Sequence, residues 1–379
     1  MGSFAVAARP IRRAAFLFLA IALVGGCSDD NATGPPPARG LQGLADSLAD
    51  AWNVPGLVVA VRHSGEEPNI VASGRADLGS GRRMAPADRF RVGSLTKPMV
   101  AIVILQLADE GRLALDDPVA RFLPGILPDA DRITLRQLLN YTSGIGDYTD
   151  DPSFLSAALA NPSRVWTPQE LIAIAAGMPR IFAPGAADRW DYSNTNYILL
   201  GLIAEEAAGQ SIATLLQTRV FEEVGMASTY YSEEASLRAP FAQGYIDLNG
   251  IPNLAAGTLV SPTVAGAAGA VVSTAGDLVR FVEALAAGTL VSSTSHAALL
   301  TTVAASRVRL PGESFDFEYG LGVLVGDGWV GHDGAIPGYE TVAYAKTGVG
   351  TVVVLVNEST ASFAVLPIAI TIRDRTFDQ

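Results

Sequence analysis

The stretch Val92-Gly93-Ser94-Leu95-Thr96-Lys97-Pro98-Met99 marks the point where the chain changes from strand-like to helical sequence. A helix is predicted over about 94–110, because a long apolar run follows Pro98 and a glycine ends the pattern. Pro98 fits the first turn of such a helix, where a missing N–H costs little. If the helix begins at Ser94, then Ser94 and Lys97 lie on one face of its first turn. The apolar run predicts a buried helix, so a lysine at its start needs a specific partner.

Strand-like runs lie near both ends of the chain, and helical patterns lie between them. A sheet built from both chain ends is therefore predicted, with helices packed on it and a helical region inserted between. The expected strands are Gly56–Arg62, Ile70–Ala76, Tyr319–Val325, Trp329–Gly334, Thr341–Ala345 and Thr351–Asn357. The expected helices outside the opening stretch are Leu41–Trp52, Leu135–Leu139, Pro168–Ala176, Asn196–Ala208, Thr274–Ala287 and 361–374.

Composition narrows the class of partner. The chain has 379 residues and a formal net charge of -12, which argues against a nucleic acid or an anionic membrane surface as partner. Three histidines are scattered through the sequence and the only cysteine is Cys27, so we expect no metal and no cofactor. We expect the protein to be a monomer.

The N-terminus is predicted to be a targeting segment. Three arginines precede the apolar segment Ala14–Gly26, which is too short for a comfortable membrane span. The segment ends directly before Cys27 and resembles a bacterial lipoprotein signal, with residues 1–26 removed and Cys27 lipidated. An ordinary secretory signal with an incidental cysteine is the alternative. Residues 27–40 are predicted to be a disordered tether, and the protein is expected on the periplasmic face of the outer or inner membrane.

A second chemical element, Tyr192-Ser193-Asn194, lies 98 residues after Ser94. A tyrosine near a lysine ammonium is expected to have a lowered pKa, so that it can act first as general base and then as general acid. Asn194 is expected to donate to the substrate amide and to hold the lysine. A loop tyrosine followed by a helix-capping asparagine is the alternative.

These elements, together with a later basic-x-Gly triad, resemble the serine β-lactamase and penicillin-binding-protein family. The nearest branch is the class C-like one, with its D-Ala-D-Ala carboxypeptidases and esterases. The stretches Leu138–Gly144, Pro184-Gly185, Ser273–Leu278 and Tyr319–Gly322 fit the same family, and the resemblance covers about residues 41–360.

The resemblance implies a two-domain fold, α/β plus all-α, of the β-lactamase/transpeptidase type. An antiparallel sheet from both chain ends would carry flanking helices, with an inserted helical domain. Within a catalytic domain at 41–379, the α/β part is expected at about 41–97 and 311–379 and the helical part at about 98–310. The resemblance also implies an acyl-enzyme mechanism with Ser94 as nucleophile.

The third element has two candidates. His332-Asp333-Gly334 follows a predicted strand, and some carboxypeptidases and esterases of the family carry His-x-Gly there. Lys346-Thr347-Gly348 spells the more familiar Lys-Thr-Gly motif, but it lies in a short glycine-containing loop between two strands. That setting predicts a hairpin tip, so His332 and Gly334 are favoured over Lys346. By the same match, the backbone N–H groups of Ser94 and Ala335 are the expected oxyanion donors.

The third element also bears on the substrate. A histidine is mostly neutral at pH 7, whereas a lysine carries a permanent charge. Asp333, assigned to substrate binding, stands where a hydroxyl residue is usual in the family. The histidine in place of lysine and the aspartate in place of a hydroxyl both weaken local binding of a substrate carboxylate. Tyr148 is predicted to line the acyl pocket.

The predicted function is that of a serine hydrolase acting through an acyl-enzyme. The favoured activity is a D-alanyl-D-alanine carboxypeptidase-like peptidase or a related esterase, with a class C-type β-lactamase as the alternative. The expected partner is thus a small peptide, ester or β-lactam substrate, and the membrane is contacted only through the N-terminal lipid. No Gly-x-Ser-x-Gly occurs in the chain, which argues against an α/β-hydrolase triad. A non-catalytic lipoprotein that binds cell-wall peptides is the alternative of another class.

Overall fold

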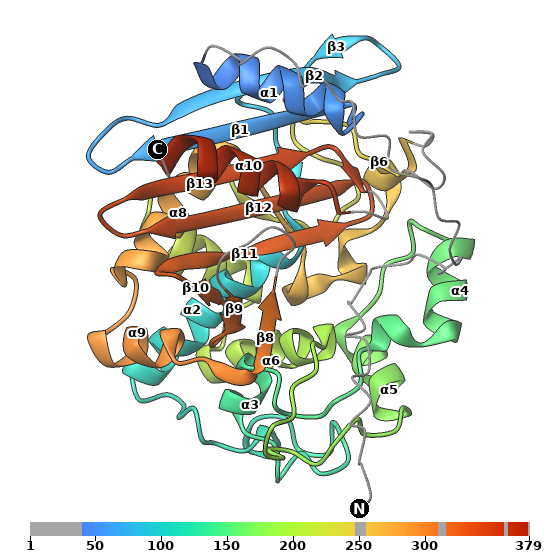
Figure 1. Ribbon diagram of the computed structural model, residues 1–379. Helices are drawn as coiled ribbons and strands as arrows, with labels where there is room; N and C mark the ends of the chain where they lie inside the picture. The colour runs from blue at the N-terminus through green and yellow to red at the C-terminus, as the bar shows by residue number, and fades with distance from the viewer. Residues whose placement is uncertain (1–39, 247–254, 310–315, 360–362, 378–379) are drawn as a thin grey trace, which may run out of the picture.

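The computed structural model describes residues 40–246, 255–309, 316–359 and 363–377 (Figure 1). The predicted signal at 1–26, Cys27 and the tether up to residue 39 lie outside these ranges. Gly40, the last residue assigned to the tether, is the first residue of a helix.

A nine-stranded sheet joins the two ends of the chain, as predicted. Strand β1, near the N-terminus, pairs antiparallel with β13, from Leu57 opposite Val356 to His63 opposite Gly350. In spatial order the strands are β3 (Arg82–Arg83), β2 (Asn69–Asp77), β1 (Gly56–His63), β13 (Gly350–Val356), β12 (Tyr339–Lys346), β11 (Trp329–Ile336), β10 (Leu324–Gly326), β9 (Asp316–Tyr319) and β8 (Val303–Arg309).

Both faces of this sheet are buried, which explains why its central strands have almost continuous apolar sequences. In β13, Val352 and Val354 belong to a core beneath α1 (Gly40–Ala51) and α10 (Val365–Phe377). Val353 faces the opposite way, into the larger core that includes α8 (Ala275–Ala287). Figure 1 shows α1 and α10 together on one face of the sheet, with α8 behind it.

The helical part is built around α2 (Thr96–Asp109), which is buried along nearly all of its length. The helix begins two residues later than predicted, because Gly93–Leu95 forms a 3-10 turn, η1, in front of it. The other helices of this part are α3 (Leu135–Leu139), α4 (Pro152–Ala160), α5 (Pro168–Ala176), α6 (Asn194–Ala208), α7 (Ile212–Leu216) and α9 (Ser293–Leu300). Two small sheets complete the described elements. The first contains β4 (Phe90–Arg91), β7 (Val271–Ser273) and β5 (Tyr230–Tyr231). The second contains β6 (Tyr245–Ile246) and β14 (Glu358–Ser359).

Two predicted boundaries need correction. The strand expected over 319–325 is two strands, β9 and β10, separated by a turn in which Gly320 N donates to Val323 O at 2.8 Å. Gly322 in that turn has a φ of +83°, a conformation that favours glycine and ends a strand. The helical part was expected to run to about residue 310, but α8 covers the sheet and β8 is one of its edge strands. The chain therefore returns to the sheet well before residue 310.

Within the ranges the structure describes, no single helix is long and apolar enough to cross a membrane. Only the bent pair formed by α6 and Ile212–Phe221, at an angle of 84°, meets the length and composition of a span.

Candidate active site

The first element of the site is the turn η1, which places Ser94 between β4 and α2. Ser94 is half-buried, whereas Lys97, one turn further on, is fully buried. Gly93 has a φ of +53°, and a Cβ there would lie 2.8 Å from the Ala335 carbonyl oxygen. A glycine is therefore required in front of the nucleophile, both by conformation and by the strand that lies against it.

Ser94 lies between the two functional groups that were predicted to serve it. Its Oγ is 2.7 Å from Lys97 Nζ and 2.8 Å from Tyr192 Oη. The fold thus brings together a lysine three residues away and a tyrosine from the loop before α6. This is the arrangement of a serine nucleophile with a base and an acid in hydrogen-bond contact.

Lys97 is held on its other side by two acceptors, Asn194 Oδ1 and the Ala268 carbonyl, each 2.9 Å from Nζ. Burial lowers the pKa of Lys97 to about 7, against the opposing effect of the nearby acids Asp147 and Asp333. A substantial fraction of the amine is then neutral at pH 7. A neutral amine at this distance can accept the proton of Ser94.

The pKa of Tyr192 was predicted to be lowered, and this prediction was wrong. Burial raises the pKa of Tyr192 well above its ordinary value, and this effect outweighs the hydrogen bond with Ser94. Lys97 Nζ lies 4.8 Å from the centre of the Tyr192 ring, but a half-neutral amine offers little charge to stabilise a phenolate. Tyr192 is therefore a phenol at neutral pH and suits the role of proton donor, whereas the partly neutral Lys97 suits the role of base.

Asn194 is placed to hold the lysine. It is 1% exposed, and its Nδ2 donates to Asp147 Oδ2 at 2.8 Å while its Oδ1 accepts from Lys97. One of the two Nδ2 hydrogens is thus bound to Asp147, so the predicted donation to a substrate amide would use the other one and stays a prediction. Asp147 was not among the predicted residues, although it lies only three residues after the Leu138–Gly144 stretch that drew attention to this loop.

Tyr148 was predicted to line the acyl pocket, and the structure contradicts this. Its side chain is fully buried, its hydroxyl donates to the Val264 carbonyl at 2.6 Å, and its ring packs edge-on against Phe154. Tyr148 therefore ties the loop after α3 to the segment before β7.

Strand β11 brings the third element beside the nucleophile turn. Thr341 on β12 lies opposite Gly334 of β11, and its hydroxyl donates to the Val92 carbonyl at 2.9 Å. A Cβ on Gly334 would collide with that carbonyl and would lie 3.0 Å from Ser94 N. Glycine at this position allows the strand to approach the turn, and the backbone of Ala335 follows it directly. The predicted neighbours Ser94, Gly334 and Ala335 are therefore brought together.

His332 is buried one strand position before Asp333 and faces a cluster of phenols. Its Nε2 is 2.9 Å from Tyr319 Oη, which is 3.5 Å from Tyr141 Oη. The Tyr141 ring lies 4.5 Å from that of Tyr192, so His332 is connected to the site through these two tyrosines. Asp333 is one-third exposed, and its Oδ1 lies 3.3 Å from His332 Nδ1.

Lys346 lies at a hairpin tip, as predicted. It pairs with Gly350 where β12 turns into β13, and its Nζ is 3.2 Å from Asp327 Oδ2. This tip lines a surface pocket with Arg62 and Glu283. The Lys-Thr-Gly sequence is therefore part of a surface turn, at the end of β12 remote from Thr341.

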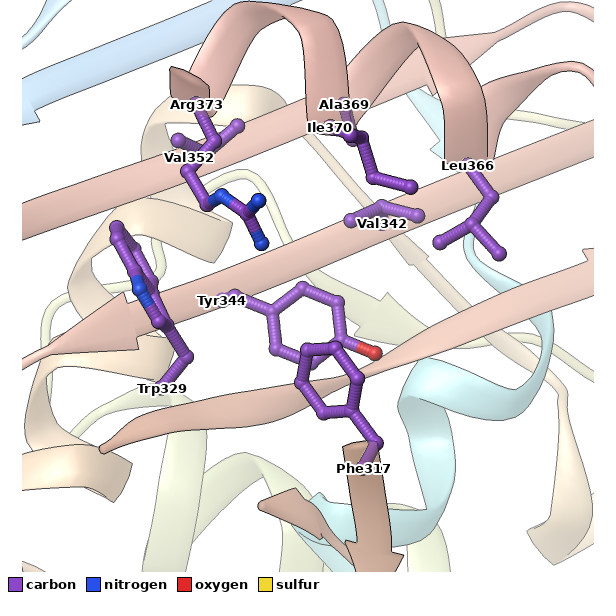
Figure 2. Close-up of a pocket in the computed structure, with 9 residues that line it drawn as sticks. All are labelled: Phe317, Trp329, Val342, Tyr344, Val352, Leu366, Ala369, Ile370 and Arg373. Atoms are coloured by element: carbon purple, nitrogen blue, oxygen red, sulfur yellow. The ribbon is translucent and has the colours of Figure 1, made fainter. Parts of the chain in front are cut away.

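Another pocket lies on the opposite face of the sheet, between α10 and the strands (Figure 2). Aromatic and aliphatic side chains line it together with Arg373, and none of the predicted site residues is among them. Among the described residues, no three His, Cys, Asp or Glu side chains lie close enough together to hold a metal ion.

Comparison with known proteins agrees with this geometry. The family model described as "Beta-lactamase" matches residues 41–372. The chain is 30% identical over 321 residues to "Penicillin-binding protein 4*" of Bacillus subtilis, which covers 80% of this chain and 67% of that protein. It is 33% identical over 199 residues to "Esterase EstB" of Burkholderia gladioli, a match that covers 50% of this chain and 50% of the esterase.

A solved structure, that of a D-stereospecific amidohydrolase from Streptomyces, superposes with a TM-score of 0.75 at 30% identity. The match covers 89% of this chain and 99% of the amidohydrolase. These relatives include an esterase and an amidohydrolase, and the amidohydrolase shares the fold described above. The chain belongs to the beta-lactamase family, among whose members are serine hydrolases.

Proposed function

We propose that this protein is a serine hydrolase that forms an acyl-enzyme on Ser94. The observation that carries the proposal is the position of Ser94 Oγ, within 2.8 Å of both Lys97 Nζ and Tyr192 Oη. The resemblance to an esterase and to an amidohydrolase supports the same chemistry.

In this mechanism the neutral Lys97 amine takes the proton of Ser94 as Oγ attacks the substrate carbonyl carbon. The backbone N–H groups of Ser94 and Ala335 stabilise the negative charge that develops on the carbonyl oxygen. The Tyr192 phenol donates its proton to the leaving group, and the Lys97 ammonium returns a proton to the phenolate. Water then attacks the acyl group by the reverse of these proton transfers and releases Ser94.

The charges around the site bear on the substrate class. The charged groups that act on Lys97 are Asp147 and Asp333, and both are negative. Asp333 is the partly exposed middle residue of the third element, so it disfavours a substrate carboxylate at that position. We therefore place small esters and amides first, including those of D-alanyl type. The D-alanyl-D-alanine carboxypeptidase and class C-type β-lactamase activities are second candidates that the family match supports.

The decisive experiment is intact-mass measurement after exposure to an activated ester, a D-amino-acid amide and a penicillin. A covalent adduct is expected with at least the ester, and Ser94→Ala should abolish it. Ser193→Ala is the matched control, because its hydroxyl bonds only to the Gly146 carbonyl at 3.2 Å and should leave the adduct unchanged. If none of the probes forms an adduct, the proposal is refuted and a non-catalytic peptide-binding protein is favoured. An adduct with penicillin faster than with the ester would reverse the order of substrates.

The location of the protein remains a proposal from sequence alone. We propose export as a lipoprotein with Cys27 acylated, on the basis of the apolar segment that ends at this cysteine. Cys27→Ser should move the protein from the membrane fraction to the soluble fraction of the producing bacterium. Retention of the variant in the membrane fraction would contradict lipidation at this position.

A further inference from the structure

We propose that Asp147 is a positioning residue for the candidate nucleophile, because it fixes the amide of Asn194 so that the amide oxygen faces Lys97. The inference deepens the proposed function and rests on it for the role of Lys97. It adds to the machinery of the site a buried carboxylate from the loop after α3, 47 residues before Asn194 in the sequence.

The hydrogen bonds of Asp147 carry the argument. Its Oδ2 accepts from both the backbone N and the Nδ2 of Asn194, at 2.9 and 2.8 Å, and its Oδ1 accepts from Thr149 N at 3.0 Å. An ionised carboxylate has acceptors only. The side-chain NH₂ of Asn194 must therefore face Asp147, and the carbonyl oxygen must face Lys97. Without the carboxylate, the amide is free to turn and present its NH₂ to the lysine, which is a clash of donors.

Charge balance points the same way. Lys97 and Asp147 are both buried, with a single amide between them, and a buried charge is costly unless an opposite charge compensates it. The groups that face Lys97 are the tyrosines Tyr192 and Tyr197, with ring centres at 4.8 and 5.7 Å, and the acids Asp147 and Asp333. Asp147 stabilises the ammonium form, so its removal is expected to lower the pKa of Lys97 further.

Asp147 has its own neighbours, and they leave it dependent on Asn194. Burial and the charge of Asp150 raise the pKa of Asp147, while the hydrogen bonds from Asn194 and Thr149 lower it. The carboxylate is thus maintained by the same bonds that orient the amide. Hydrogen bonds therefore connect the side chains of Asp147, Asn194, Lys97 and Ser94 into one unit, the lysine unit.

A purely structural role is the competing explanation, because Asp147 also caps the short turn η3 (Tyr148–Asp150). The chain offers a matched control in Asp151, four residues further along the same loop. Asp151 caps α4 through Ser153 N at 2.8 Å and Phe154 N at 3.1 Å. Asp147→Asn and Asp151→Asn therefore each remove a capping charge from this loop, and only the first touches the lysine unit.

The readout uses an unusual property of the composition, since the chain contains only two lysines, Lys97 and Lys346. Full-length protein labelled at the lysine side chain gives two NMR titrations, and Lys346→Arg identifies that of Lys97. In the wild type the midpoint for Lys97 is expected near pH 7. In Asp147→Asn it should fall by about one pH unit, as expected when a nearby opposite charge is lost, and ester acylation should slow about tenfold or more. Asp151→Asn should leave both unchanged.

An unchanged Lys97 midpoint in Asp147→Asn, or equal effects of the two variants, would overturn the proposal. If Asp147→Asn does not fold, Asp147→Ser replaces it, because serine retains a good capping acceptor without the charge. The titration requires no turnover, so it separates the two ideas. A wild type that no ester acylates would refute the proposed function, and the Lys97 midpoint would still decide the role of Asp147.

Discussion

Replacing Lys97 with methionine should change how the stability of the protein depends on pH. In the folded chain burial lowers the pKa of Lys97 from its ordinary 10.5 to about 7. In the unfolded chain the amine is exposed to water and has its ordinary pKa. Between these two values the unfolded chain binds one more proton than the folded chain. The contribution of Lys97 is therefore fully present above about pH 10.5, and it is lost as the pH falls through 7.

The size of the effect follows from the two pKa values. One pH unit within this window corresponds to about 1.4 kcal/mol, so the whole window amounts to about 5 kcal/mol. Between pH 7 and pH 9 the wild type should gain about 2 kcal/mol relative to Lys97→Met. The variant also leaves Asn194 Oδ1 and the Ala268 carbonyl without their donor, but that cost does not vary with pH in this range.

The assay is denaturant unfolding of both proteins at pH 7, 8 and 9, monitored by tryptophan fluorescence. Lys346→Met is the control, because Lys346 is partly exposed and paired at the surface with Asp327, and its difference from wild type should stay flat over this range. A difference between wild type and Lys97→Met that is constant from pH 7 to pH 9 would refute the reasoning. Lys97 would then be charged throughout that range, and the neutral-amine mechanism would fail with it.

The remaining predictions concern the third element. Gly334→Ala places a Cβ against the Val92 carbonyl, so ester acylation should fall about a hundredfold or more, roughly 2.7 kcal/mol; a near-wild-type rate would show that the strand does not need to lie so close to the turn. Lys346→Ala should leave turnover nearly unchanged, since its Nζ is bound to a surface carboxylate. His332→Ala should slow turnover about tenfold or more, roughly 1.4 kcal/mol, because it breaks the contact with Tyr319. The reverse order of these two variants would move the third element to the hairpin.

The features that could be predicted from the sequence are those with a local signature. The pair Ser94 and Lys97 lies three residues apart at the start of an apolar run, and the helix that follows is buried as expected. The glycine loop after Lys346 predicts a hairpin because strand-like runs flank it, and the structure confirms this. The pairing of both chain ends in one sheet follows from the continuous apolar runs that mark strands buried on both faces.

The features that were missed depend on distance and burial, which spacing does not report. The lowered pKa expected for Tyr192 assumed a charged lysine beside the phenol, whereas Lys97 is fully buried and its pKa is lowered to about 7. Asp147 and Asn194 are 47 residues apart in the sequence, so no short spacing indicates that they meet. Tyr148 attracted attention in its place as an aromatic residue in a loop near the site, but its ring is part of the core.

The pairing of β1 with β13 has a consequence for the order in which this protein matures. A chain growing from its N-terminus completes β1 before the helical part, yet the central partner of that strand, β13, is made only after it. Pairing between such distant segments is slow, because a long loop must close before any contact compensates for it. The site at the Ser94 turn is likewise incomplete until Gly334 and Ala335 have been made. A nascent or truncated chain that ends before β11 is expected to carry Ser94 without hydrolytic activity, which should appear only after β11, β12 and β13 have been made.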